Sequence, residues 1–152
     1  MEPSAPLAGR ALIDFENELS DAFGLQGVLI GLDDLLLCWR AMPSSPGATY
    51  LDANSIPAIS LPLLEGDHTL SVLLRLRGRR SGGVNFSGYW FEVRSTHVFH
   101  VDRGKLTKLA SIAYEKGGPA KPPVERPAIR YVKREGLPIA SPGESGAAAQ
   151  AP

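Results

Sequence analysis

Residues 89–101 read YWFEVRSTHVFHV, and this stretch decides the fold class more than any other part of the chain. Aromatic and apolar residues recur at every second position, with polar and charged residues between them. Because successive side chains of a β-strand point to opposite faces, the pattern predicts a long strand with one apolar face. The residues expected on that face are Tyr89, Phe91, Val93, Ser95, His97, Phe99 and Val101.

Further strands are expected on both sides of this stretch. Leucine or valine occupies every second position from Leu70 to Leu76, which predicts a strand with one buried face. Residues 79–88 contain three glycines and predict a long hairpin connection. Residues 102–105 predict a tight turn, since Gly104 can adopt positive φ. A last strand is then expected from about Lys105 to Glu115.

The N-terminal part of the chain has helical spacing instead. Leu12, Phe15, Leu19 and Phe23 recur at intervals of three or four, which predicts an amphipathic helix ending at Gly24. A second helix is predicted over 32–42, with Asp33 and Asp34 in its first turn and Pro43 as its stop. Helices followed by a run of antiparallel strands predict an α+β fold.

The chain is expected to form one domain. Residues 1–9 are interpreted as a flexible arm and residues 10–118 as the folded domain. Residues 116–152 contain seven Pro and five Gly, so residues 119–152 are predicted to be a disordered tail that folding does not need. Within that tail, only Ile129–Val132 has the character of a short ordered piece.

Composition limits the classes of function. Sixteen Lys and Arg balance sixteen Asp and Glu, which argues against a dedicated nucleic-acid binder and against adsorption to anionic membranes. One cysteine, Cys38, excludes an intramolecular disulfide. The N-terminus lacks the pattern of a signal peptide, so the cytoplasm is the expected location. Zero net charge gives little repulsion between copies, and a homodimer formed through the sheet is expected because Trp90 and Val98 lie on the face opposite Phe91.

Three motifs over residues 63–115 resemble the polyketide-cyclase (SnoaL-like) branch of the ketosteroid-isomerase superfamily. They are Glu65-Gly66-Asp67, the glycine-rich connection over 78–88, and the turn DRGKL over 102–106. The resemblance implies a cone-shaped fold, in which a curved antiparallel sheet packs on the N-terminal helices around an apolar pocket. The positions that match the catalytic His and Asp of those cyclases hold Arg80 and Tyr114 here.

Candidate site residues follow from this expected pocket. His97 is a candidate acid or base, since an imidazole titrates near neutral pH, and Tyr114 is a candidate hydrogen-bond donor. The alternatives are a half-buried, bonded histidine and a packing tyrosine. The residues expected to contact a hydrophobic ligand are Trp39, Tyr89, Phe91 and Phe99.

Two functions remain open at this point. One is a cofactor-free cyclase, isomerase or dehydratase that binds a hydrophobic ring or polyketide-like compound. The other is a non-catalytic ligand-binding or dimeric assembly module on the same fold. The sequence contains no phosphate-binding loop, dinucleotide fingerprint, Ser-His-Asp signature or metal-ligand spacing, so no cofactor and no metal are expected.

Overall fold

The computed structural model describes residues 8–41, 51, 56–81, 84–117 and 122–138. These residues form ten strands and one short 3-10 turn, Pro123–Glu125, and contain no α-helix. The strands are β1 (Ala8–Asn17), β2 (Phe23–Leu32), β3 (Leu35–Ala41), β4 (Ile59–Leu64), β5 (Gly66–Gly78), β6 (Arg80–Ser81), β7 (Val84–Asn85), β8 (Trp90–Val101), β9 (Lys105–Glu115) and β10 (Pro127–Pro138).

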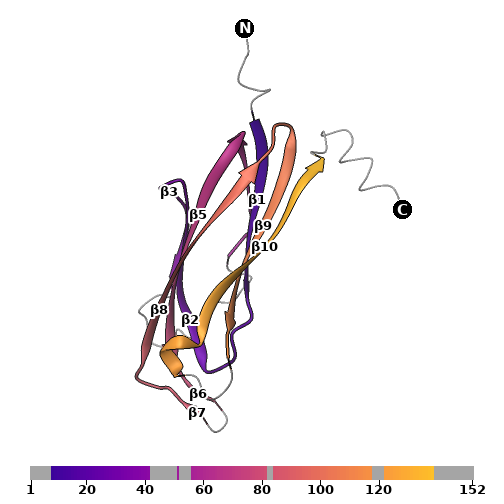
Figure 1. Cartoon of the computed structure of the whole chain (residues 1–152). Helices are drawn as coiled ribbons and strands as arrows, with labels where there is room; N and C mark the ends of the chain where they lie inside the picture. The colour runs from indigo at the N-terminus through magenta and orange to yellow at the C-terminus, as the bar shows by residue number, and fades with distance from the viewer. Residues whose placement is uncertain (1–7, 42–50, 52–55, 82–83, 118–121, 139–152) are drawn as a thin grey trace, which may run out of the picture.

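Eight of the strands build two four-stranded sheets that pack face to face (Figure 1). Sheet 1 has the order β10-β9-β1-β4, and sheet 2 has the order β3-β2-β5-β8. Strands β1 and β9 run parallel, whereas the other pairs in the two sheets are antiparallel. The short pair β6 and β7 forms a separate hairpin between β5 and β8.

The core lies between the two sheets and follows the alternation of the strands. On β5, Leu70, Val72, Leu74 and Leu76 are each at most 2% exposed, while the residues between them are more open. Sheet 1 contributes its own alternating set from β1 and β9, which includes Ala11, Ile13, Phe15, Leu109 and Ala113. Burial of such a set is the main favourable term in folding.

The predicted strands over 70–77, 89–101 and 105–115 are confirmed as parts of β5, β8 and β9. The alternation on β8 is also confirmed, since Phe91, Phe99 and Val101 are buried and Trp90 and Val98 are exposed. The predicted turn at 102–105 is present, with Gly104 at φ 71°. These features depend on local pattern and turn chemistry, which the sequence carries directly.

The α+β prediction is wrong, because both predicted helices are strands. In the first segment Ala11, Ile13 and Phe15 are buried at a spacing of two, and they face the core from β1. The helical spacing that begins at Leu12 shares Phe15 with this period-two set, so the local sequence fits both structures. Pairing with β4 on one side and β9 on the other selects the strand.

The second predicted helix is a hairpin. Asp33 and Asp34 have φ values of 49° and 67°, which are left-handed conformations that no helix start adopts, and they turn the chain from β2 into β3. Aspartate tolerates this region better than most residues because its short side chain can bond locally. The cone-shaped ketosteroid-isomerase-like fold and the SnoaL-like resemblance are therefore also wrong, since the helices they need are absent from the described residues.

The C-terminal part of the described chain is ordered further than expected. Within the predicted tail of 119–152, the structure places Pro127–Pro138 in β10, an edge strand of sheet 1 that pairs with β9. Residues 139–152 lie outside the described residues. No helix in the described part is long and apolar enough to cross a membrane.

Candidate functional site

The aromatic residues expected to line a pocket are divided between the core and the surface. Phe99 is 1% exposed and Phe91 7% exposed, and both belong to the packed core. The Phe91 ring meets the Phe23 ring edge-on, with centroids 5.1 Å apart. Tyr89 stacks at the outer end of this group, 6.3 Å from Phe91, while Trp39 is on β3 at the far side of sheet 2. The rings on the inner face of β8 therefore fill the interior of the sandwich.

His97 is half-buried on the inner face of β8, at the side of the sandwich where β8 and β10 meet. Its ring stacks on Tyr131 of β10, with centroids 4.4 Å apart and planes 15° apart. The Tyr131 hydroxyl donates a hydrogen bond to Ser95 Oγ at 2.8 Å. Burial, and then the nearby charge of Lys133, lower the pKa of His97. The neutral imidazole is thus favoured at this seam.

The side chains of Tyr114 and His97 point to different faces of the sandwich. It lies on β9 of sheet 1, at a position between buried Ala113 and half-buried Glu115, and its ring faces the Arg130 guanidinium at 5.6 Å. The alternation of β9 directs Thr107, Leu109 and Ser111 to the core and Tyr114 to the outer face. The predicted pairing of His97 as base with Tyr114 as donor is therefore not brought together by the fold.

A histidine that the sequence analysis did not single out occupies the opposite side of the sandwich. His68, near the start of β5, has its Nδ1 2.5 Å from Asp33 Oδ2 and its Nε2 2.7 Å from the Leu64 carbonyl oxygen. Asp33 Oδ1 also accepts a hydrogen bond from the Thr69 backbone N–H at 2.8 Å. Asp33 and His68 are 35 residues apart, so nothing in the local sequence indicates their contact.

A second histidine at this end of the molecule is also held between acceptors. His100 Nδ1 lies 2.8 Å from Asp67 Oδ1, and its Nε2 lies 3.2 Å from Asp102 Oδ1. These contacts tie β5 and the β8–β9 turn together. Both histidines serve to join strands and turns, and neither lies beside a nucleophilic side chain in the contacts described.

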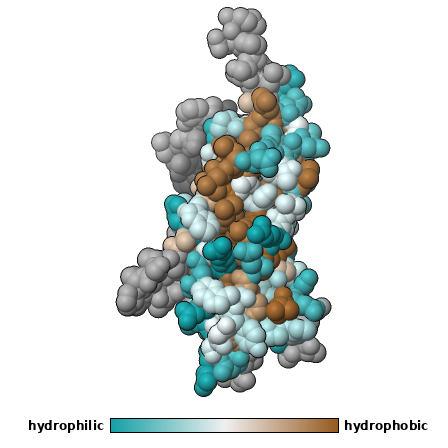
Figure 2. Space-filling view, turned by 90° about the vertical axis from the view of Figure 1, so that its left-hand side faces the viewer, coloured by the Kyte–Doolittle hydropathy of each residue, from teal (hydrophilic) through white to brown (hydrophobic). Residues whose placement is uncertain are grey.

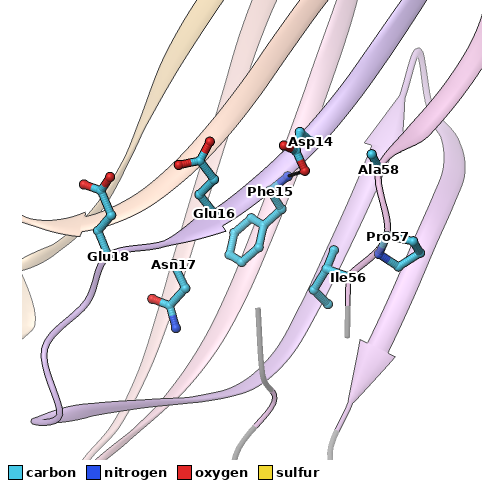
Figure 3. A pocket seen from close by; sticks show the side chains of 8 residues that line it. All are labelled: Asp14, Phe15, Glu16, Asn17, Glu18, Ile56, Pro57 and Ala58. Carbon is cyan, nitrogen blue, oxygen red and sulfur yellow. Dashed lines mark hydrogen bonds between the residues drawn. The ribbon is translucent and has the colours of Figure 1, made fainter. Parts of the chain in front are cut away.

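An open hollow of about 540 Å³ lies beside the end of β1 (Figure 3). Carboxylates of Asp14, Glu16 and Glu18 follow one side of the strand there, while Phe15 points to the other side. Glu18 accepts a hydrogen bond from Arg130 Nη2 at 2.8 Å, and Asp14 Oδ1 accepts one from the Phe15 N–H at 2.9 Å. Within the described ranges, no group of three or more His, Cys, Asp or Glu side chains has the arrangement to hold a metal ion.

The outer face of sheet 2 is unusually apolar for a solvent-facing surface. Leu29 of β2 pairs with Trp39 of β3 on one side and with Leu73 of β5 on the other, which gives an apolar row across three strands. The Trp39 ring lies over Gly27, because a Cβ placed there would come 3.7 Å from its Cη2 atom. Figure 2 views this side and shows an apolar band along it, with hydrophilic residues on both flanks.

Additional exposed apolar side chains lie on the same face outside this row, since Val98 is paired with Thr69 and Trp90 with Arg77. On sheet 2, Leu36 is 57%, Val98 58% and Trp90 62% exposed. We call the set Leu29, Leu36, Trp39, Leu73, Trp90 and Val98 the outer apolar face. Leu73 could have indicated this face from the sequence, since it is the one apolar residue among the outward positions 71, 73, 75 and 77.

Comparison with known proteins adds no family to this description. No family model, no curated protein and no solved structure matches the chain.

Proposed function

We propose that this chain is a non-catalytic assembly module in which two copies associate through the outer apolar face of sheet 2. The observation that carries the proposal is the row formed by Trp39, Leu29 and Leu73 across three adjacent strands. A sheet face in water normally presents polar side chains, and a contiguous apolar patch marks an interaction site.

The charges around the patch favour a second copy of the same chain as the partner. Glu92 lies between Arg75, at 3.5 Å, and Arg94, at 3.1 Å, so the face carries both signs of charge close together. In a two-fold interface the same patch meets itself, and such a mixed set can exchange partners between copies. Zero net charge of the chain also removes long-range repulsion between the copies.

The size of the face is adequate for a dimer. Four strands spaced about 4.8 Å apart, with about 3.3 Å per residue, give a surface of roughly 20 Å by 40 Å along the longest strands. A stable interface takes about 800 Å² from each partner. Both sheets carry charged residues on their outer faces, but the row of Trp39, Leu29 and Leu73 is on sheet 2. Sheet 2 is therefore the better interface.

The buried state of Phe91 and Phe99 supports assembly over catalysis. An enzyme that acts on a hydrophobic ring compound needs an open apolar cavity with a convergent acid or base. Here Phe91 and Phe99 belong to the core, and His97 and Tyr114 face different ways.

Sedimentation velocity at micromolar concentration tests the proposal. We expect a species of twice the chain mass for the native sequence. Val98→Arg places a charge on the outer apolar face, at its β8 edge, and is expected to raise the dimer Kd at least about a hundredfold. Val132→Arg, on the exposed side of sheet 1, is the matched control and is expected to leave the dimer intact. A native chain that sediments as a monomer, or a dimer insensitive to Val98→Arg, would contradict the proposed function.

A further inference from the structure

His68 joins the β2–β3 turn to the connection between β4 and β5 through one ring. It lies near the start of β5, and its side chain is only 12% exposed. Its Nδ1 contacts Asp33, in the turn between β2 and β3, and its Nε2 contacts the carbonyl of Leu64, at the end of β4. The contact to Asp33 is within sheet 2, whereas the contact to Leu64 spans the short connection from β4 into β5, with the two residues 4 apart in the sequence.

Both partners of the ring are hydrogen-bond acceptors. A carboxylate and a carbonyl oxygen have no hydrogen to offer, so both ring nitrogens must donate, and only the protonated imidazolium has two N–H groups. A neutral ring would set a nitrogen lone pair against an oxygen lone pair at one of the two contacts. The full set of contacts therefore requires a positively charged His68.

The charged groups around the ring act in the same direction. Burial by itself opposes the charged form, but the bonds to Asp33 and Leu64 and the charges of Asp33 and Asp67 raise the pKa of His68. Partial burial of Asp33 opposes its charged form, but the hydrogen bonds from His68 and Thr69 lower the pKa of Asp33. On the remaining side His68 faces the ring of Phe99, 6.0 Å away, which carries no charge.

The turn that His68 holds belongs to the hairpin that carries part of the outer apolar face. Asp33 is bonded to Thr69 twice, since its N–H donates to the Thr69 carbonyl at 2.9 Å and its carboxylate accepts from the Thr69 N–H. From this turn β3 runs along the edge of sheet 2 and presents Leu36 and Trp39. The position of the turn therefore controls the position of these two side chains.

We propose that His68 is a pH-dependent latch that ties the β2–β3 hairpin to the connection between β4 and β5 and thereby orders the outer apolar face. This inference deepens the assembly function proposed above and rests on it. When the ring loses its proton to solvent, one of the two contacts becomes repulsive, and the turn is then held mainly by the two bonds between Asp33 and Thr69. The hairpin then samples more conformations, and ordering it again on association weakens the dimer.

Hydrogen exchange in a monomeric chain tests the latch separately from assembly. The Val98→Arg variant is used at about pH 6 and about pH 8, with exchange rates corrected for intrinsic chemistry. We expect the backbone amides of Leu35–Trp39 to lose protection by about tenfold at the higher pH, as an imidazolium bond is lost. His100→Gln, which changes the other histidine at this end, is expected to leave that loss in place.

Asp33→Asn is expected to reverse the direction in which hairpin protection changes with pH. Its side-chain oxygen can still accept from the Thr69 N–H, and asparagine also tolerates the left-handed turn. Its amide would donate to Nδ1 of a neutral ring, whose Nε2–H would donate to Leu64. We expect this variant to keep the hairpin protected at about pH 8 and to lose protection at about pH 6.

Sedimentation of the chain with its native face completes the test. We expect the dimer Kd to rise about tenfold from about pH 6 to about pH 8, and to fall over the same range in Asp33→Asn. The latch would be overturned if hairpin protection in Val98→Arg did not change with pH. It would also be overturned if Asp33→Asn lost protection at the higher pH, as the native residue does. A pH-dependent hairpin in a chain that is monomeric at every pH would overturn the assembly function and retain the latch on the hairpin.

Discussion

At the scale of single residues, His97 and His68 are held in opposite ways. His97 stacks on Tyr131, and within the described part of the chain its buried Nε2 has no hydrogen-bond partner. His68 has an acceptor at each nitrogen. Burial without a partner favours the neutral ring, whereas two acceptors favour the charged ring. Burial and the charge of Lys133 therefore set the direction of the pKa shift of His97, whereas at His68 the bonds and nearby charges outweigh burial.

The stability contributed at His97 should depend on pH with a defined sign. Since the pKa of His97 is lowered in the folded chain, the unfolded chain binds the proton more tightly, and stability is lost as pH falls from about 6.5 toward the folded pKa. His97→Phe keeps the stacking and removes the buried nitrogen, so we expect it to stabilise the fold by about 1–2 kcal/mol at low pH. Urea unfolding at several pH values measures the difference. A stability gain of His97→Phe over the native chain that grows as pH rises would contradict this account.

At the scale of single elements, the β2–β3 hairpin shows how a turn overrides a helical pattern. Its two central residues, Asp33 and Asp34, both have positive φ. Two-residue hairpin turns of this kind favour Asn or Asp followed by Gly, because their twist matches that of the strands. Asp33 has bonds to His68 and Thr69 that hold it in place. Asp34 fills the position where glycine is preferred.

Substitution of each aspartate by glycine should separate these roles. Asp34→Gly relieves the cost of a left-handed residue and is expected to stabilise the fold by about 0.5–1 kcal/mol. Asp33→Gly removes the carboxylate and is expected to destabilise it by about 1–3 kcal/mol. Thermal unfolding of both variants at about pH 6 gives the comparison. Equal effects from the two substitutions would show that the bonds of Asp33 carry no stability.

Strand β10 changes the expectation that everything after Gly118 is dispensable. It pairs with β9 from Pro127 to Pro138, and Tyr131 closes the seam with β8 through His97 and Ser95. A chain ending at Gly118 would expose the edge of β9 and the core beneath it. We expect such a truncation to abolish cooperative unfolding or to lower Tm by more than about 10 °C.

A chain ending at Pro138 is the matched control for this truncation, since it retains every contact described above. We expect its Tm to stay within about 2 °C of the full chain. If both truncations unfold at the same temperature as the full chain, β10 contributes nothing to stability.

At the scale of the whole molecule, the sandwich is fastened at two places by different chemistry. The β8 and β10 side is held by the stack of His97 on Tyr131, and the end at which the β2–β3 turn meets the β4–β5 connection is held by the bonds of His68. Acid weakens the first fastening, and base weakens the second. The two sheets are therefore tied most completely over an intermediate range of pH.

Association through the outer apolar face should make thermal stability depend on protein concentration. Any partner that binds only the folded chain shifts unfolding by mass action. We expect Tm at about pH 6 to rise by several degrees for a hundredfold increase in concentration, and to stay constant in Val98→Arg. Differential scanning fluorimetry over that range gives the measurement. A Tm that does not change with concentration in the native chain would argue against a dimer.

The amino-acid sequence by itself determined the parts of this protein that rest on short-range pattern. The alternation over residues 89–101, the turn at Gly104 and the exposed positions of Trp90 and Val98 could all be predicted, since neighbours along a strand decide them. The N-terminal segments were different. Ala11, Ile13 and Phe15 have a strand spacing, while Leu12, Phe15, Leu19 and Phe23 have a helical spacing, so the local sequence does not choose between the two.

Only the tertiary structure decided between them, because the choice depends on partners far away in the chain. Strand β1 is selected by pairing with β9, nearly a hundred residues later, and β10 is ordered by the same strand. The contact of His68 with Asp33 exists because β2 and β5 pair with Leu32 opposite Leu70. Hydrogen bonds between strands form only when both strands are in place, so the fold class and the latch are properties of the assembled sandwich and not of any single segment.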